Sequence, residues 1–230
     1  MSEKSTKPGA IADANALSGS DGAQAHVRRW WGLVPRTLTH PTEVFVALRD
    51  DDDVDVDARS EPILAIVIIA GMAGILLTPA WATLLDEQSL DWMVIAVITF
   101  IGGLFYGAAG YFLLGLVVWL GARAVGLDAP TRTARQAVGF SALPFALSFL
   151  VTVPVVLVVY RYDWFHTGGS DDGIGRVVVL SVALALALWS LGLLALGLRT
   201  TFELPWRGVV GALALAAVIV AAFAVLPSSL

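Results

Sequence analysis

The stretch GGLFYGAAGYFLLGLVVWLGARAVG, from Gly102 to Gly126, decides the fold of this chain. It has no charged residue before Arg123, and its apolar part is long enough for the roughly 20 helical residues that cross about 30 Å of hydrocarbon. Glycine recurs along it, at positions 102, 103, 107, 110, 115 and 121. We therefore expect this stretch to lie in a transmembrane helix.

The composition of the whole chain agrees with a membrane protein. Of its 230 residues 57% are hydrophobic and 14% are charged, and the mean hydropathy is +0.79, whereas about a quarter of the residues of a soluble domain are charged. The net charge of −5 excludes a general nucleic-acid binder. The lack of cysteine excludes disulfides, thiolate metal clusters and a cysteine nucleophile.

Apolar runs predict an all-α polytopic membrane protein with five transmembrane helices. The spans are expected at about 62–85, 92–122, 138–160, 174–198 and 208–227, which makes 62–230 the membrane domain. Residues 1–27 have too few apolar side chains to fold and are expected to form a disordered cytoplasmic tail. Residues 28–61 should form an interfacial helix, beginning at Pro41 with an apolar face of Val44, Phe45 and Leu48, and an acidic joint.

The distribution of basic residues predicts the orientation. Twelve of the fourteen Lys and Arg residues fall in the N-terminal region and in the 2–3 and 4–5 connectors, and Arg161 and Arg176 are alone on the opposite side. Basic residues favour the cytoplasmic side, so the N-terminus is expected to be cytoplasmic and the C-terminus external. Seven of the eight tryptophans fall near predicted span ends, as in interfacial belts. We expect a multi-pass protein of the plasma membrane.

An acidic run between Asp50 and Glu61 resembles a calcium loop at first sight. With Asp53 at position one of an EF-hand, however, position six is Ala58 and position twelve is Leu64, where glycine and glutamate are required. Repulsion between neighbouring carboxylates favours an extended, hydrated chain. We interpret the run as a solvated joint, with loose divalent binding as the alternative, and expect no metal site and no cofactor.

Catalytic motifs are not found, and we expect a non-enzymatic protein. The central part of each span lacks Asp, Glu, Lys, Arg and His, the usual groups of proton relays. Ser141 and Ser148 have no intramembrane base to activate them. His166, three residues after Asp163, could belong to an acid–base or metal pair, but a simple loop histidine is the favoured interpretation.

Gly103 and Gly107 form a GxxxG pattern, which lets two helix backbones approach closely in lipid. The candidate site is a helix-packing seam or a partner groove, made by Gly103, Tyr106, Gly107, Gly110 and Tyr111 of the second span and Pro144 and Pro154 of the third. Each proline removes a backbone hydrogen bond and should kink its helix. The kinks are interpreted as fixed shape, with hinges as the alternative.

Several further stretches carry a family resemblance. They are P-x-E-V-F-x-x-L at Pro41–Leu48, the glycine-rich second span, FSALPFALSFL at Phe140–Leu150, and WSLGLLALGLR before an alanine-rich fifth span. Over about residues 33–227 this order resembles the prokaryotic branch of the Yip family, the Ypt/Rab-interacting membrane proteins with a Yip-one domain. The resemblance implies five spans without catalytic residues. Eukaryotic relatives contact Rab-type GTPases and have a cytosolic DLYGP motif, which is missing here, so a GTPase contact is doubtful.

Two function classes follow from these observations. The first is a membrane-organising or scaffold protein that binds the lipid bilayer, other membrane proteins or a second copy of itself, and no nucleic acid. The alternative is a small permease or channel subunit for a neutral or small solute. Its hydrated path would be lined by a few neutral side chains, namely Thr99, Tyr106, Tyr111, Ser141, Ser148, Thr152 and Ser190.

Overall fold

Helices make up all the regular structure of the described part of the chain. The computed structural model describes residues 32–49, 53–77, 91–124, 126–127, 130–161, 164 and 173–225, with the backbone alone at 53–62, 92, 220 and 222–225. The predicted disordered tail at 1–27 lies outside these ranges. A helical stretch at 32–39 precedes α2 (Pro41–Arg49), α3 (Asp53–Leu77), α5 (Trp92–Ala124), α6 (Thr131–Ser141), α7 (Leu143–Val159), α8 (Ile174–Thr201) and α9 (Trp206–Val225). The all-α prediction is confirmed.

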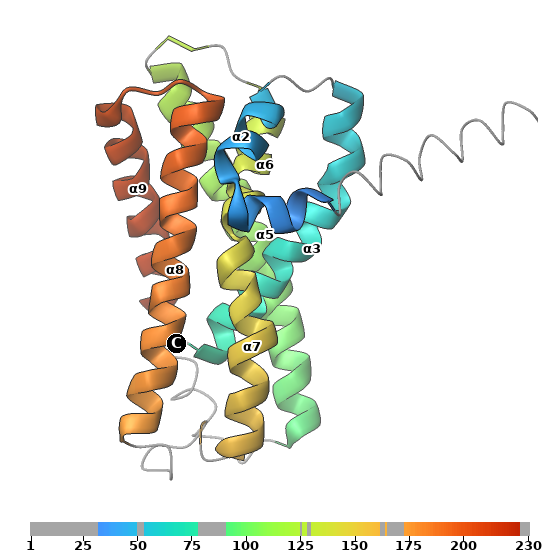
Figure 1. Ribbon diagram of the computed structural model, residues 1–230. Helices are drawn as coiled ribbons and strands as arrows, with labels where there is room; N and C mark the ends of the chain where they lie inside the picture. The colour runs from blue at the N-terminus through green and yellow to red at the C-terminus, as the bar shows by residue number, and fades with distance from the viewer. Residues whose placement is uncertain are drawn as a thin grey trace, which may run out of the picture.

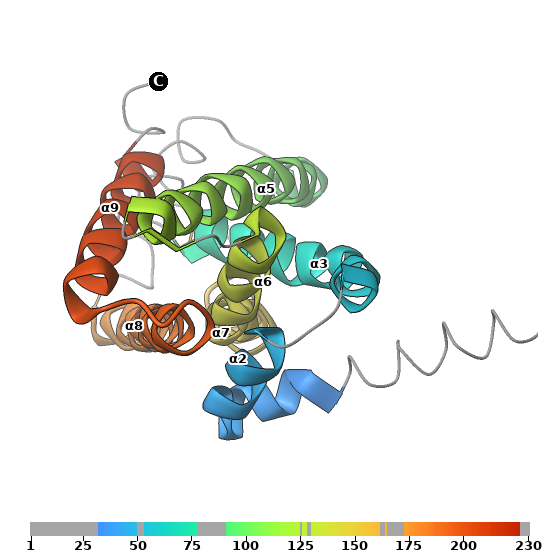
Figure 2. The ribbon, with the colours of Figure 1, turned by 90° about the horizontal axis from the view of Figure 1, so that it is seen from above.

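The long helices run between two ends of one bundle (Figure 1). The connectors from α5 to α6 and from α8 to α9 lie at one end, together with α2. The helices α6 and α7 run in the same direction, and α3, α5, this pair, α8 and α9 cross the bundle in alternating directions. Seen from above, α3, α6 and α7 lie between α5 and α8, and α9 contacts both α5 and α8 (Figure 2). The arginine-bearing helix ends next to these two connectors therefore share one end of the bundle.

Three helical segments of the described part are long and apolar enough to cross a membrane: Met93–Ala124, Thr131–Val159, which combines α6 and α7, and Ile174–Thr201. They match the second, third and fourth predicted spans. Two shorter apolar helices, Ile63–Leu77 and Trp206–Ile219, lie where the first and fifth spans were predicted. Large apolar side chains cover the outside of the bundle, as expected for helices that face lipid. The count of five spans and the orientation stay predictions.

The third predicted span consists of two helices, because α6 ends at Ser141 and α7 begins at Leu143. Pro144 occupies the first turn of α7, where a missing backbone N–H is tolerated. The N–H of Ala142 still donates to the carbonyl groups of Val138 and Gly139. The expected irregularity near Pro144 is thus a break between two helices, whereas Pro154 lies inside the continuous helix α7.

The acidic run differs from the extended chain that the sequence predicts. The helix α3 begins at Asp53, so the backbone of residues 53–61 is helical. Carboxylates in the first turns of a helix interact favourably with the positive end of its dipole, and this offsets part of their mutual repulsion. The first three acidic residues, at 50–52, lie outside the described residues, as do the side chains of the rest of the run.

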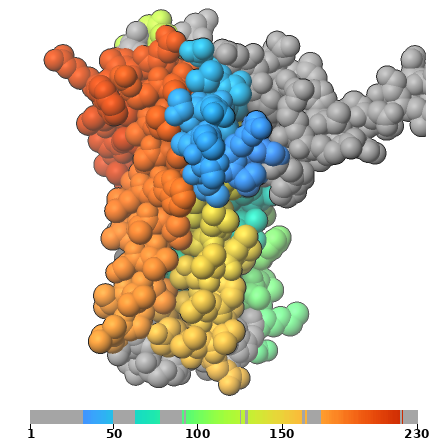
Figure 3. All heavy atoms as spheres, in the orientation of Figure 1, coloured from blue at the N-terminus to red at the C-terminus, as the bar shows by residue number. Residues whose placement is uncertain are grey.

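Two clusters of apolar side chains hold the bundle together. The larger one lies at the end that carries α2 and includes Phe45, Phe140 and Leu198, which are completely buried. The smaller one lies toward the other end and includes Trp164 and Val156. In the space-filling view α2, in blue, lies flat against α8, in orange (Figure 3). The apolar face that we predicted for the interface is therefore covered by protein, since Val44, Phe45 and Leu48 are at most 2% exposed.

Candidate functional site

Two helix backbones approach each other closely where α3 crosses α5. A Cβ atom on Gly107 would lie 2.5 Å from the carbonyl oxygen of Val67, and one on Gly103 would lie 2.8 Å from the backbone nitrogen of Met72. Across this seam, a Cβ on Gly71 would overlap the carbonyl oxygen of Gly103 and lie 2.7 Å from the nitrogen of Gly107. Any side chain at these three positions would force the helix axes apart.

Sequence reasoning missed Gly71, the glycine that α3 contributes to this seam. Its signal was present, because Ala70, Gly71, Ala73 and Gly74 put small residues on successive turns of the first predicted span. Such a pattern shows that a close contact is possible, but it does not name the partner helix.

The other predicted site residues do not all gather at the seam. Tyr106 is half-buried, and a Cβ on Gly110 would meet nothing within 4 Å. Tyr111 is only 6% exposed and packs edge-to-face against Phe112, with ring centroids 5.4 Å apart. Pro144 and Pro154 belong to α7, the first buried and the second exposed. The predicted set is thus spread over α5 and α7.

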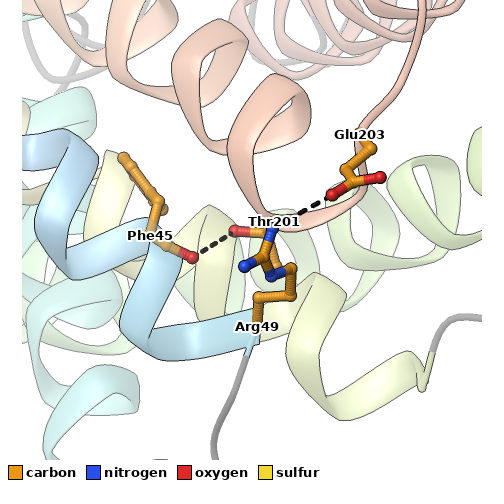
Figure 4. Close-up of polar contacts among 4 residues, drawn as sticks. All are labelled: Phe45, Arg49, Thr201 and Glu203. Atoms are coloured by element: carbon orange, nitrogen blue, oxygen red, sulfur yellow. Dashed lines mark hydrogen bonds and ion pairs between the residues drawn. The ribbon is translucent and has the colours of Figure 1, made fainter.

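A second contact, between α2 and the end of α8, was also missed. The ring of Phe45 lies over Gly197, where an added Cβ would be 2.8 Å from its Cε1 atom. The Thr201 hydroxyl donates a hydrogen bond of 3.0 Å to the carbonyl oxygen of Phe45, and Arg49 forms a 3.0 Å ion pair with Glu203 (Figure 4). Apolar packing, a buried hydrogen bond and an exposed ion pair together attach α2 to the bundle.

The connector that receives α2 has a constrained backbone. Glu203 has a φ of 51°, in the left-handed region that non-glycine residues seldom adopt. The N–H of Leu204 donates to the carbonyl of Leu198 at 3.4 Å, and the Leu204 side chain is fully buried. The short α8–α9 connector is therefore held in one shape, with the Glu203 carboxylate directed toward Arg49.

At the opposite end, Trp164 lies against α3. Its Nε1–H donates a 3.0 Å hydrogen bond to the carbonyl of Leu76, in the last turn of α3. The guanidinium of Arg176 lies 5.3 Å from the Trp164 ring, and the ring of Tyr160 is 5.9 Å away. The last carbonyl groups of a helix lack partners within the helix, so the indole N–H caps the end of α3. Trp164 itself is only 2% exposed.

Three of the seven hydroxyls on which a permease would depend bond to helix backbone. Ser141 donates to Ala137 at 2.6 Å and Ser148 to Phe145 at 2.5 Å, while Ser190 accepts from the N–H of Phe145 at 3.1 Å. Thr99 and Thr152 are buried, and their Oγ1 atoms have no hydrogen-bond partner in the described structure. These three hydroxyls therefore join or bend helices, whereas those of Thr99 and Thr152 stay without a partner in the described core.

The described side chains include no group of three or more His, Asp or Glu residues that could hold a metal ion. His166 and Asp163, the predicted loop pair, lie outside the described residues, as do the side chains of the acidic run. The structure therefore does not test either of these two metal hypotheses.

A comparison with known protein families shows which family the sequence matches. The family model of the Yip1 domain matches residues 36–227, which include every helix from α2 to α9 and the three contacts described above, those of α3 with α5, of α2 with α8 and of Trp164 with α3. Searches of curated proteins and of solved structures each gave no match. The matched range is most of the 230 residues, and its apolar helices are those of a membrane protein. The chain therefore belongs to the Yip1 domain family.

Proposed function

We propose that this protein is a non-enzymatic, five-span organiser of the plasma membrane, with a cytoplasmic N-terminus and an external C-terminus. Support comes from the shared end of the α5–α6 and α8–α9 connectors, because the helix ends next to these connectors carry Arg123, Arg132, Arg135, Arg199 and Arg207. Cations cluster on the cytoplasmic side of membrane proteins. The assignment to a prokaryote is likewise a prediction from the resemblance.

The close packing of α3 on α5 is the observation that carries the scaffold role. Where glycine backbones touch, no room is left for a solute between these two helices. Binding is then expected on the outside of the bundle, where exposed apolar faces can contact lipid, other membrane proteins or a second copy of the chain. Contact with a GTPase is not part of the proposal.

A small permease is kept as a second candidate because of Thr99 and Thr152. Two buried hydroxyls without partners are unusual, since such groups cost free energy unless they bind water or a ligand. A neutral solute with hydrogen-bonding groups could use them.

Photo-crosslinking in native membranes, joined to a flux assay, tests both candidates. A photoreactive residue is placed at three exposed positions on different helices, Phe105, Val158 and Val218. A scaffold should give the same protein adduct from one of these faces and none from the others. Equal lipid adducts from all three faces would contradict binding to a protein partner. Solute flux in proteoliposomes that is lost in Thr99→Val and Thr152→Val would establish the permease instead.

A further inference from the structure

Arg135 has an unusual position in the bundle. Sequence reasoning placed it in a connector, but it lies in the second turn of α6 with its stem packed on the backbone of α5. A Cβ on Gly115 would lie 3.3 Å from the Arg135 Cα and would overlap its Cγ. Glycine at 115 thus makes the notch in which the arginine lies.

The guanidinium of Arg135 emerges on the flank of α5 that faces lipid. Its Cζ is 5.3 Å from the centroid of Phe112, which is 51% exposed, and the next turn of this flank carries the exposed Leu116. Its Nε donates a 3.4 Å hydrogen bond to the carbonyl of Thr131. Among the residues that the structure describes, no acidic side chain pairs with it.

A cation at this depth needs a counterion. Gly115 precedes the end of α5 at Ala124 by about 13 Å along the helix axis, at 1.5 Å per residue. If α5, which is far longer than a bilayer requires, is centred in the membrane, Gly115 lies about 5 Å inside the border of the hydrocarbon. Charged groups there are costly unless they reach headgroups or pair with an opposite charge.

Two neighbouring features favour an anion at the same place. Tyr111 is 6% exposed, and its hydroxyl bonds to no residue in the described ranges. It lies one turn before Gly115 on α5 and against Gly139, one turn after Arg135 on α6, where an added Cβ would be 3.6 Å from the Tyr111 Cε2 atom. The start of α6 has no acidic residue in its first turn and no side-chain cap from Pro130. An anion at Arg135 would therefore meet a guanidinium, with a phenolic donor about one helical turn away on one side and the positive end of a helix dipole about one turn away on the other.

We propose that Arg135 and Tyr111 bind the phosphate of an anionic phospholipid, whose acyl chains lie along Phe112 and Leu116. The headgroup should be anionic because the described surroundings offer only positive charge, and a choline headgroup would add another cation beside the guanidinium. This deepens the lipid-binding part of the proposed function and depends on the membrane placement of α5 proposed there.

The test is a lipid titration of the purified, delipidated full chain in neutral detergent. Phosphatidylglycerol and phosphatidylcholine with identical chains are added, and binding is measured by native mass spectrometry and by the rise in melting temperature. Phosphatidylglycerol should bind preferentially. Arg135→Gln should weaken its binding roughly tenfold or more, and Tyr111→Phe, which leaves the packing intact, should weaken it severalfold.

The matched control is Arg123→Gln, which removes an equal charge from the same end of the bundle. Its guanidinium lies on Trp119 at the end of α5, and we expect almost unchanged binding. An equal loss of phosphatidylglycerol binding in Arg123→Gln and Arg135→Gln would overturn the proposed site, and so would equal binding of the two lipids. If Arg135→Gln does not fold, unchanged affinity of Tyr111→Phe overturns it.

Two further outcomes separate the sources of failure. Equal stabilisation by inorganic phosphate would show a free-phosphate site and overturn the lipid assignment. A chain that inserts normally but shows no preference for phosphatidylglycerol would contradict this site alone. A chain that does not insert would contradict the five-span proposal as well.

Discussion

Phe45 packs directly on Gly197, and this contact fixes α2 on the side of α8. Gly197→Ala would put a methyl group 2.8 Å from the Phe45 ring, so we expect overpacking to cost about 1–3 kcal/mol. Thermal unfolding in detergent, followed by circular dichroism, measures the loss. The control is Gly192→Ala on the same helix, where a Cβ meets nothing within 4 Å. If both variants melt at the same temperature, the Phe45–Gly197 contact does not hold α2.

A second prediction concerns the seam between α3 and α5. Gly107→Ile should separate the helices and forfeit their dispersion contacts, which lowers the melting temperature or prevents folding. Ala108→Ile, about 100° around the helix, should cost clearly less. Gly110→Ala should be neutral or stabilising by up to about 1 kcal/mol, because the site is open and alanine favours helix. Equal behaviour of Gly107→Ile and Ala108→Ile would end the claim that this face is special.

The difference between Gly107 and Gly110 shows how much of the site could be predicted. Spacing alone predicted a close contact at Gly103 and Gly107, because three intervening residues bring two glycines to one helix face. It could not find Gly71, because one helix's pattern does not identify the helix that it meets. Nor could it separate Gly110 from Gly107, since both lie in the same small-residue run.

The helices themselves were largely predictable, because long apolar runs leave few other folds in lipid. Two features were not. The face of Phe45 was expected to meet the membrane interface, but amphipathicity shows only that a face is covered, and both lipid and α8 can cover it. The acidic run was expected to be extended, because charge repulsion was weighed without the helix dipole at Asp53.

The polar contacts of α2 differ in burial, and their contributions should differ accordingly. Thr201→Val removes a hydrogen bond at a residue that is 6% exposed, and should cost about 0.5–1.5 kcal/mol. Glu203→Gln breaks an ion pair whose side chains are 43% and 72% exposed, and should cost well under about 1 kcal/mol. The effect of Glu203→Gln should also vanish at high salt. A larger and salt-independent loss in Glu203→Gln than in Thr201→Val would contradict this ranking.

Trp164 is expected to stabilise the end of α3 through its indole N–H. Trp164→Phe keeps an aromatic ring but leaves the Leu76 carbonyl without its partner, so we expect a loss of about 1 kcal/mol or more. Hydrogen exchange should rise in the last turn of α3 and stay unchanged at α2, which lies at the other end of the bundle. Unchanged exchange in α3 would show that the hydrogen bond does not hold this helix end.

The orientation is tested with single cysteines, because the chain has none of its own. The arginines in the helix ends beside the α5–α6 and α8–α9 connectors share an end with α2, and basic residues favour the cytoplasm, so α2 should be inside. An impermeant thiol reagent added to intact cells should then label Ser170→Cys and Ser228→Cys but not Ser18→Cys. Lysis before labelling is the control, and it should make all three sites reactive. The reverse pattern would place the arginine-rich end outside. Labelling of Ser170→Cys without Ser228→Cys would mean that the last helix, α9, does not cross the membrane.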